Sequence, residues 1–165
     1  MSVGLTTQFK ASLRGLLKPS TAVGDVRADD TVGVSFDLTD GTSANQADLK
    51  YFARRTLGAG ASEDLDLAGV LANQFGTTLT IAKVKAIALS NPSTNSGDIT
   101  IGGASSNAWT AMFTGTILIP PGGSIVLGGP GTGKTVTAGT GDKLKVLNGG
   151  SGSVDYDILV IGTSV

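Results

Sequence analysis

Glycine, proline and asparagine interrupt this chain at short intervals, and no other feature restricts its fold more. Glycine alone supplies 25 of the 165 residues. Between the interruptions stand short runs of alternating apolar and polar residues, and no run with helical period reaches about ten residues. Turn signals spaced roughly every 8 to 12 residues are typical of all-β sandwiches and barrels. We therefore predict an all-β fold, an antiparallel β-sandwich or jelly roll, because a parallel α/β sheet would require crossover helices.

The strand predictions rest mainly on period-two alternation, which is cleanest in the run that begins at Thr31. The segment at 79–89 changes phase near 82–84, as a β-bulge would cause. Two late runs flank the glycine-rich turn NGGSG and predict a β-hairpin. The expected strands are 31–38, 49–57, 64–67, 79–89, 98–103, 108–113, 115–119, 124–127, 143–147 and 154–162, the last two forming that hairpin.

The first residues are ambiguous, because residues 8–18 fit both a helical stripe and a strand. Gly15 and the closing Pro19 favour an extended segment. We expect residues 1–25 to form an extended N-terminal arm that becomes ordered only against a neighbouring subunit or the capsid, and residues 26–165 to form a single β-sandwich domain. Three cations of the arm make either a solvated face or a contact with an acidic neighbour: Lys10, Arg14 and Lys18.

The segment GGPGTGKT at 128–135 matches the phosphate-binding pattern G-x-x-x-x-G-K-[ST]. Such a loop works only where it opens directly into a helix, whose N-terminal amides hold the phosphates. Here β-branched Val136 and Thr137 follow, and then Gly139, which favours a strand and a turn. We interpret the match as a decoy and expect no cofactor at its four matching positions: Gly128, Gly133, Lys134 and Thr135.

The residue types that are missing narrow the chemistry. The sequence has no cysteine and no histidine, which removes thiolate nucleophiles, the usual zinc ligands and the commonest proton-transfer group. We therefore expect no enzyme activity, no catalytic residues and no metal. Twelve basic and 13 acidic residues leave a net charge of -1, so no bulk attraction to nucleic acid or anionic lipid is expected. No apolar stretch approaches the roughly 18 to 20 residues of a membrane span.

Carboxylates gather in three places where a catalytic pair or a calcium site could form. The acids at 63–66 lack the spacing of the twelve-residue calcium loop, and Asp155 and Asp157 share one strand face, which we interpret as an exposed outer face. Asp29 and Asp30 form the third group. Neither a catalytic pair nor a calcium site is therefore expected.

Adjacent arginines inside an expected strand place two cations on opposite faces, so at least one must pair with an acid or lie at an interface. The single tryptophan suits the core or a subunit contact better than a ligand platform. The expected interface residues are Lys10, Arg14, Lys18, Arg54, Arg55 and Trp109.

Several stretches from about residue 30 onward resemble small structural proteins of tailed bacteriophages. They are DGTSANQADLKY (40–51), RRTLGAGASEDLDLAGVL (54–71), FGTTLTIAKVKAIAL (75–89), VTAGTGDKLKV (136–146) and VDYDILVIG (154–162). The resemblance implies a jelly-roll decoration or cement protein on the capsid exterior of the virion. It also implies dimers or trimers that bind the major capsid protein across the joints between its subunits. The related pattern has an aromatic residue near Lys134, so the 128–135 loop departs from it.

Two other functions stay open from the residues alone. One is a receptor- or carbohydrate-binding module of the virion, which would require an exposed cluster among one tryptophan, two tyrosines and five phenylalanines. The other is an NTP-binding protein that uses the 128–135 loop. We expect a non-enzymatic structural protein with the major capsid protein and itself as partners.

Overall fold

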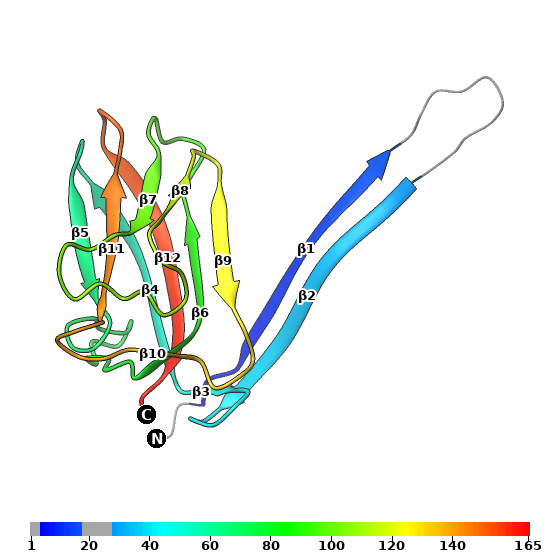
Figure 1. Cartoon of the computed structure of the whole chain (residues 1–165), viewed down its shortest axis with the longest axis vertical. Helices are drawn as coiled ribbons and strands as arrows, with labels where there is room; N and C mark the ends of the chain where they lie inside the picture. Colours follow the sequence, from blue (N-terminus) through cyan, green and yellow to red (C-terminus); the bar gives the residue numbers. More distant parts are fainter. Residues whose placement is uncertain (1–3, 18–27) are drawn as a thin grey trace.

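The structure, a computed structural model, describes residues 4–17 and 28–165. In these residues every regular element is a β-strand, so the predicted all-β class is confirmed, and the arrangement is consistent with a β-sandwich. Figure 1 shows two parts, a two-layered sandwich and a long hairpin that projects away from one end of it. The jelly-roll topology stays a prediction. No helix in the described segments is long and apolar enough to cross a membrane.

One layer of the sandwich, called here the arm-side sheet, lies next to the projecting hairpin. Its strand order is β10-β6-β12-β4, and β9 pairs with β6 on the edge that β10 also uses. All of its pairs are antiparallel. The strands are β4 (Leu49–Leu57), β6 (Lys83–Ser90), β9 (Ser124–Gly128), β10 (Lys134–Thr135) and β12 (Val154–Thr163).

The second layer, called the far sheet, has the strand order β5-β11-β7-β8 and is also antiparallel. The main core lies between the two layers, where β12 buries Tyr156, Ile158 and Val160 and β11 buries Leu144 and Val146. Alternate residues of each strand enter this core because successive side chains of a strand point to opposite faces. The far-sheet strands are β5 (Ser62–Asp66), β7 (Ile99–Gly102), β8 (Thr116–Ile119) and β11 (Lys143–Asn148).

The predicted hairpin between 143–147 and 154–162 is wrong. Both segments are strands, but β11 pairs with β5 and β7 in the far sheet while β12 pairs with β4 and β6 in the arm-side sheet. The turn between them crosses from one layer to the other and is held by the buried side chain of Asn148. Its Nδ2 donates to the carbonyls of Gly58 (2.8 Å) and Gly152 (2.7 Å). Glycine-rich turns serve both kinds of connection, so turn chemistry alone could not distinguish them.

Two other expected strands are shorter or absent. In the 79–89 segment, β6 begins only at Lys83, because the amides of Leu79 and Ile81 donate to loop carbonyls rather than to a sheet. In the 108–113 segment, Ala108 makes only an isolated bridge to Lys143. The apolar side chains of both segments still enter the core. The alternating pattern therefore correctly indicated which side chains are buried, although the backbone there does not form a strand.

The projecting hairpin consists of β1 (Thr7–Leu17) and β2 (Ala28–Asp40), which pair antiparallel along the whole length of β1. The extended conformation is therefore confirmed for the described part of the N-terminal segment. Its partner strand is β2 of the same chain. The short strand β3 (Gln46–Ala47) pairs in parallel with the end of β2 at the base of the hairpin. The expected boundary after residue 25 lies outside the described residues, and β2, which that boundary assigned to the sandwich, belongs to the hairpin.

Candidate functional site

The projecting hairpin has one apolar and one polar face, as the alternation of its two strands dictates. Residues that lie directly opposite each other share a face, and in the middle of the hairpin the register places apolar residues opposite apolar ones. The pairs on the apolar face are Phe9 with Phe36, Ala11 with Val34 and Leu13 with Val32. Leu13 and Val32 are each 78% exposed, so the outer part of this face meets solvent in a single copy.

The polar face carries two of the predicted interface cations, Lys10 and Arg14, and the third, Lys18, lies outside the described residues. The Nε of Arg14 donates to Asp29 Oδ1 at 2.7 Å, and its Nη2 forms an ion pair with Oδ2. This hydrogen bond lowers the pKa of Asp29 below its usual value. The acidic neighbour that the sequence suggested for this arm is therefore, for Arg14, the second strand of its own hairpin.

The base of the hairpin packs on the outer face of the arm-side sheet. Leu38 is fully buried there against Ala86 of β6 and Ile161 of β12, in a small core separate from the main one. Just above, the rings of Phe9 and Phe36 stack with centroids 4.6 Å apart and planes 7° from parallel. The apolar face of the hairpin is thus anchored at one end and open at the other.

A buried lysine links two loops next to the base of the hairpin. The register steps from Ile161–Ala86 to Gly162–Val84, which leaves Lys85 as the extra residue of a bulge in β6. Its side chain is only 1% exposed, and its Nζ donates to the carbonyls of Ser43 (3.1 Å) and Gly131 (2.6 Å). Burial, followed by the charge of Lys83, lowers the pKa of Lys85. The sequence indicated a bulge near 82–84, but nothing local indicated these acceptors.

The glycine-rich loop at 128–135 braces the hairpin. Besides the contact of Gly131 with Lys85, the carbonyl of Pro130 accepts from the amide of Asn45 at 2.7 Å, in the turn that follows β2. A phosphate-binding loop would begin a helix at Lys134, whereas here Lys134 is exposed and starts β10, which pairs with β6. The loop therefore contacts the turn at 41–46, a relationship that the sequence left open.

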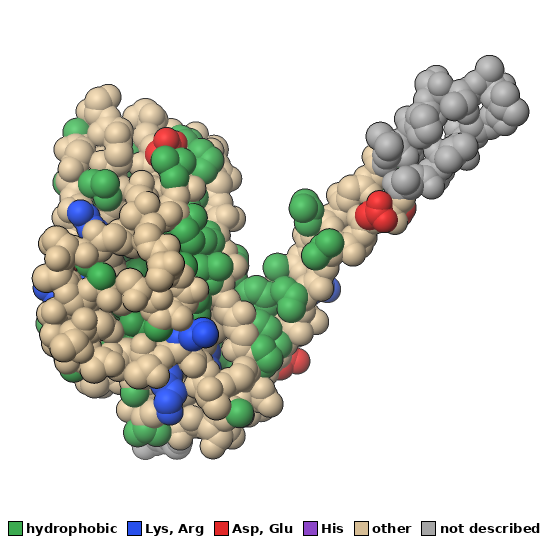
Figure 2. Space-filling model, in the orientation of Figure 1, with side chains coloured by type: hydrophobic (Ala, Val, Ile, Leu, Met, Phe, Trp, Pro, Cys, Tyr) green, Lys and Arg blue, Asp and Glu red, His purple; other side chains and the backbone are tan. Residues whose placement is uncertain are grey.

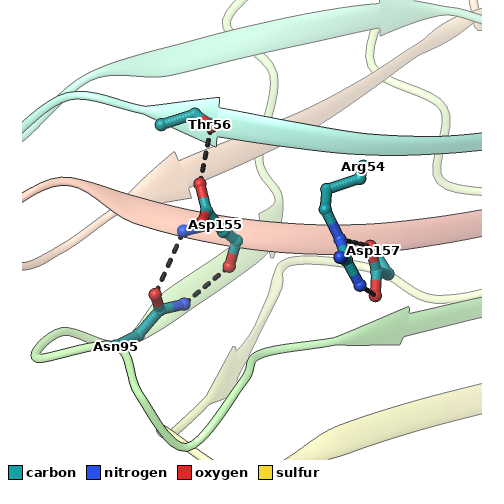
Figure 3. A network of polar contacts seen from close by, with 5 residues as sticks. All are labelled: Arg54, Thr56, Asn95, Asp155 and Asp157. Atoms are coloured by element: carbon teal, nitrogen blue, oxygen red, sulfur yellow. Dashed lines mark hydrogen bonds and ion pairs between the residues drawn. The ribbon is translucent and has the colours of Figure 1, made fainter.

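Two acids on the outer face of β12 pair with neighbours on the same face, as Figure 3 shows. Arg54 donates to Asp157 through Nε (2.7 Å) and Nη2 (2.8 Å), and this hydrogen bond lowers the pKa of Asp157. Asp155 accepts from Thr56 Oγ1 at 2.5 Å, and its backbone exchanges two hydrogen bonds with the side chain of Asn95. The carboxylates that could have shared a cation are thus engaged separately.

Arg55 points to the other side of β4, where it forms an ion pair with Glu63 and donates to Tyr51 Oη at 3.2 Å. Tyr156 Oη also donates to Glu63, at 2.7 Å. Burial first, and then this hydrogen bond, raises the pKa of Tyr156. The two adjacent arginines therefore both pair with acids, in line with their predicted placement on opposite faces.

The structure also places the single tryptophan and the acids at 63–66. Trp109 is a core residue whose Nε1 donates to the carbonyl of Thr135 at 2.8 Å, so of its two expected placements, core or subunit contact, the structure shows the core. Glu63 turns inward while Asp64 and Asp66 lie opposite Lys145 and Lys143 on the far sheet. Within residues 4–17 and 28–165 no three acids gather as metal ligands.

The outer face of the arm-side sheet carries an apolar row that the sequence did not reveal. The row runs across four strands and lies between two other rows of the same face. On one side, Ile161 and Ala86 are covered by the hairpin base, and on the other lies the pair of Arg54 and Asp157. The row consists of Phe52, Leu159, Ala88 and Val126, each opposite the next in the register.

Between this row and the apolar face of the hairpin lies an open V-shaped space, called here the arm cleft. Its inner end is a groove of about 210 Å³ with Phe9 on one wall and Ala88, Val126 and Leu159 on the other. The same three sheet residues line a second groove of about 180 Å³ that continues past Phe52. Figure 2 shows hydrophobic side chains on the sandwich beside the hairpin and on the hairpin itself.

The arm cleft is the most distinctive surface of the described residues, and it joins strands that are far apart in the sequence. Period-two alternation gave the apolar face of β2, but the row on the sheet depends on which strands are neighbours. No family model, no curated protein and no solved structure matches this chain.

Proposed function

We propose that this protein is a non-enzymatic structural protein of a bacteriophage virion, a decoration or cement protein on the capsid exterior. In this role it binds the major capsid protein across the joints between subunits and stabilises the head. The resemblance of residues 40–162 to such proteins supports the role and further implies a jelly-roll topology and a dimer or trimer. The observation that carries the proposal is the projecting hairpin with an open apolar face.

A projecting hairpin of this kind is suited to holding a neighbour. Two-stranded hairpins are at best marginally stable alone, so a long one is stabilised by covering its apolar face. In this chain the sandwich covers only the base, up to the stack of Phe9 and Phe36. A contact between subunits would cover the rest, and repeating it over many copies turns weak contacts into firm attachment.

The polar groups of the sandwich support a structural role in another way. The ion pairs of Arg54 with Asp157 and of Arg55 with Glu63 link strands, and Lys85 links two loops. Each of these side chains is accounted for by a contact that positions the fold. The hairpin and the sheet face beside it carry exposed apolar side chains, and we assign recognition to this surface.

Co-sedimentation with empty heads assembled from the major capsid protein alone would test the proposal. We expect the full chain to sediment with the heads, to saturate at a fixed ratio to the capsid protein, and to raise the temperature at which the heads break open. Failure of the full chain to bind such heads at saturating concentrations would refute the capsid role. A glycan array probed with the same preparation addresses the alternative of a carbohydrate-binding module, which predicts saturable binding there instead.

A further inference from the structure

We propose that the arm cleft is a docking site for a second copy of this chain, whose hairpin enters it. In the dimer, the hairpin of each copy would occupy the cleft of the other copy. This inference specifies the contact between copies that the proposed function implies, and it is tested separately from binding to capsid protein.

The first support is a contact within the chain itself. At the base of the hairpin, its apolar face already packs against the outer face of the arm-side sheet, with Leu38 on Ile161 and Ala86. The two surfaces are therefore complementary in character where they touch. Farther out they diverge, so the outer hairpin pairs are exposed, and so are Phe52 and Val126 at the two ends of the apolar row. A second hairpin would continue the same kind of packing.

The second support is the outer part of the hairpin, which exposes apolar side chains on its apolar face and one more, Leu16, on its polar face. Leu13 and Val32 lie on the apolar face, and Leu16 places one apolar side chain on the otherwise polar face, where it is 46% exposed. From Phe9 to Leu16 the strand extends about 24 Å at roughly 3.4 Å per residue. A described segment of this length, with Leu13 and Val32 on one face and Leu16 on the other, can contact both walls of the cleft at once. The apolar walls and this segment are provided by the same chain.

The third support is symmetry. Every copy has one hairpin and one cleft. A two-fold axis therefore places the hairpin of each copy in the cleft of the other, and both contacts form at once. Charge agrees with this arrangement. The exposed Asp30 lies at the outer end of the apolar face, and the exposed cation Lys50 lies beside Phe52 on the sheet. Opposite charges at the margins of an apolar contact favour the correct partner and register.

The oligomeric state of the full chain tests the proposal directly, by light scattering or sedimentation velocity over a range of concentrations. We expect a dimer for the wild type and a monomer for Val32→Asp, because a carboxylate would be buried in the exchanged contact. Val70→Asp is the matched control, since Val70 is 70% exposed and lies outside the cleft. Circular dichroism should show both variants folded, because Val32 contacts solvent in the single copy.

Cross-linking tests the position of the partner, and the absence of native cysteine makes it clean. Leu16→Cys and Val126→Cys proteins are mixed, allowed to exchange and oxidised mildly. We expect a disulfide-linked dimer that contains one copy of each variant. A mixture of Val70→Cys with Val126→Cys should give no such product above background.

Several outcomes would overturn the inference. One is a wild type that stays monomeric at its highest soluble concentration, and another is a dimer that Val32→Asp weakens no more than Val70→Asp. A monomer that binds empty heads through Val32 would assign the cleft to the capsid protein and leave the proposed function standing. A dimer that exchanges hairpins but never binds heads would leave this inference standing while the proposed function falls.

Discussion

Phe9 and Phe36 stack across the two strands of the hairpin at the place where the hairpin leaves the sandwich. Toward the base, Leu38 is buried on the arm-side sheet, and toward the tip, Val34 and Val32 are exposed. The stack therefore closes the anchored part of the hairpin. Phe9 of the stack also lines the groove at the inner end of the arm cleft, so this ring belongs both to the anchored part of the hairpin and to the cleft.

Replacing Phe36 by alanine should loosen the hairpin without unfolding the sandwich. The lost stack is worth about 1 kcal/mol, which corresponds to roughly fivefold faster hydrogen exchange in β1. Exchange in β12 should be unchanged. Phe75→Ala is the control, because Phe75 is 83% exposed and outside both cores. Equal protection of β1 in wild type and Phe36→Ala would mean that the stack does not anchor the hairpin.

Lys85→Met should detach the glycine-rich loop from the turn that follows β2. Methionine cannot donate to the carbonyls of Ser43 and Gly131, and one such hydrogen bond contributes about 1 kcal/mol. We expect severalfold faster exchange of the Asn45 amide, which donates to Pro130 in the same contact. Lys134→Met, on the exposed end of the loop, should leave that amide unaffected.

Lys85 should also give stability a pH dependence. Its pKa is lowered in the folded chain, so the folded chain binds fewer protons than the unfolded chain between the two pKa values, and stability rises with pH in that window. The uncharged amine retains two N–H groups for its two carbonyl acceptors. Urea unfolding should be measured near neutral pH and at about pH 10. The free energy of unfolding of the wild type should rise relative to that of Lys85→Met as the pH is raised. A gain on acidification instead would contradict the assigned direction.

Arg54→Gln should raise the pKa of Asp157 toward its ordinary value, because the lost hydrogen bond favours the charged carboxylate. A carboxylate with a lowered pKa stabilises the fold above its unfolded pKa and ceases to do so as pH falls through the folded pKa. The wild type should therefore lose more stability than Arg54→Gln on acidification below about pH 4. Carboxyl NMR titration checks the shift. Arg14→Gln should instead raise the pKa of Asp29 and leave the pKa of Asp157 unchanged.

Gly162→Ala should destabilise the sandwich by roughly 2 kcal/mol, the usual scale for overpacking. A Cβ at Gly162 would lie 2.5 Å from the carbonyl oxygen of Lys83 and 2.7 Å from a methyl group of Ile81, beside the bulge. Gly58→Ala is the matched control, because a Cβ there meets nothing within 4 Å. Chemical denaturation of the two variants should differ clearly, and similar midpoints would show that the bulge yields easily.

Much of the fold followed from local pattern. The alternation of Val32, Val34 and Phe36 predicted both a strand and its apolar face, since side-chain direction repeats every two residues in any extended chain. The opposed directions of Arg54 and Arg55 followed for the same reason. The pattern at 79–82 misled because its side chains alternate into the core while its backbone bonds to loops.

Partner choice did not follow from local pattern. The turn NGGSG predicted a hairpin, yet β11 and β12 lie in different layers, because pairing depends on total burial and not on the turn alone. The same is true of Lys85, whose acceptors are 42 and 46 residues away in the sequence.

Residue order by itself therefore established much of the strand pattern, the face of each side chain and the extended backbone after the 128–135 loop, because steric limits on the backbone act between near neighbours. Tertiary structure alone decided that β1 and β2 leave the sandwich together and that Phe52, Leu159, Ala88 and Val126 align in one row. These features arise from contacts between strands far apart in the chain, where many pairings satisfy each strand and only the packed whole selects among them.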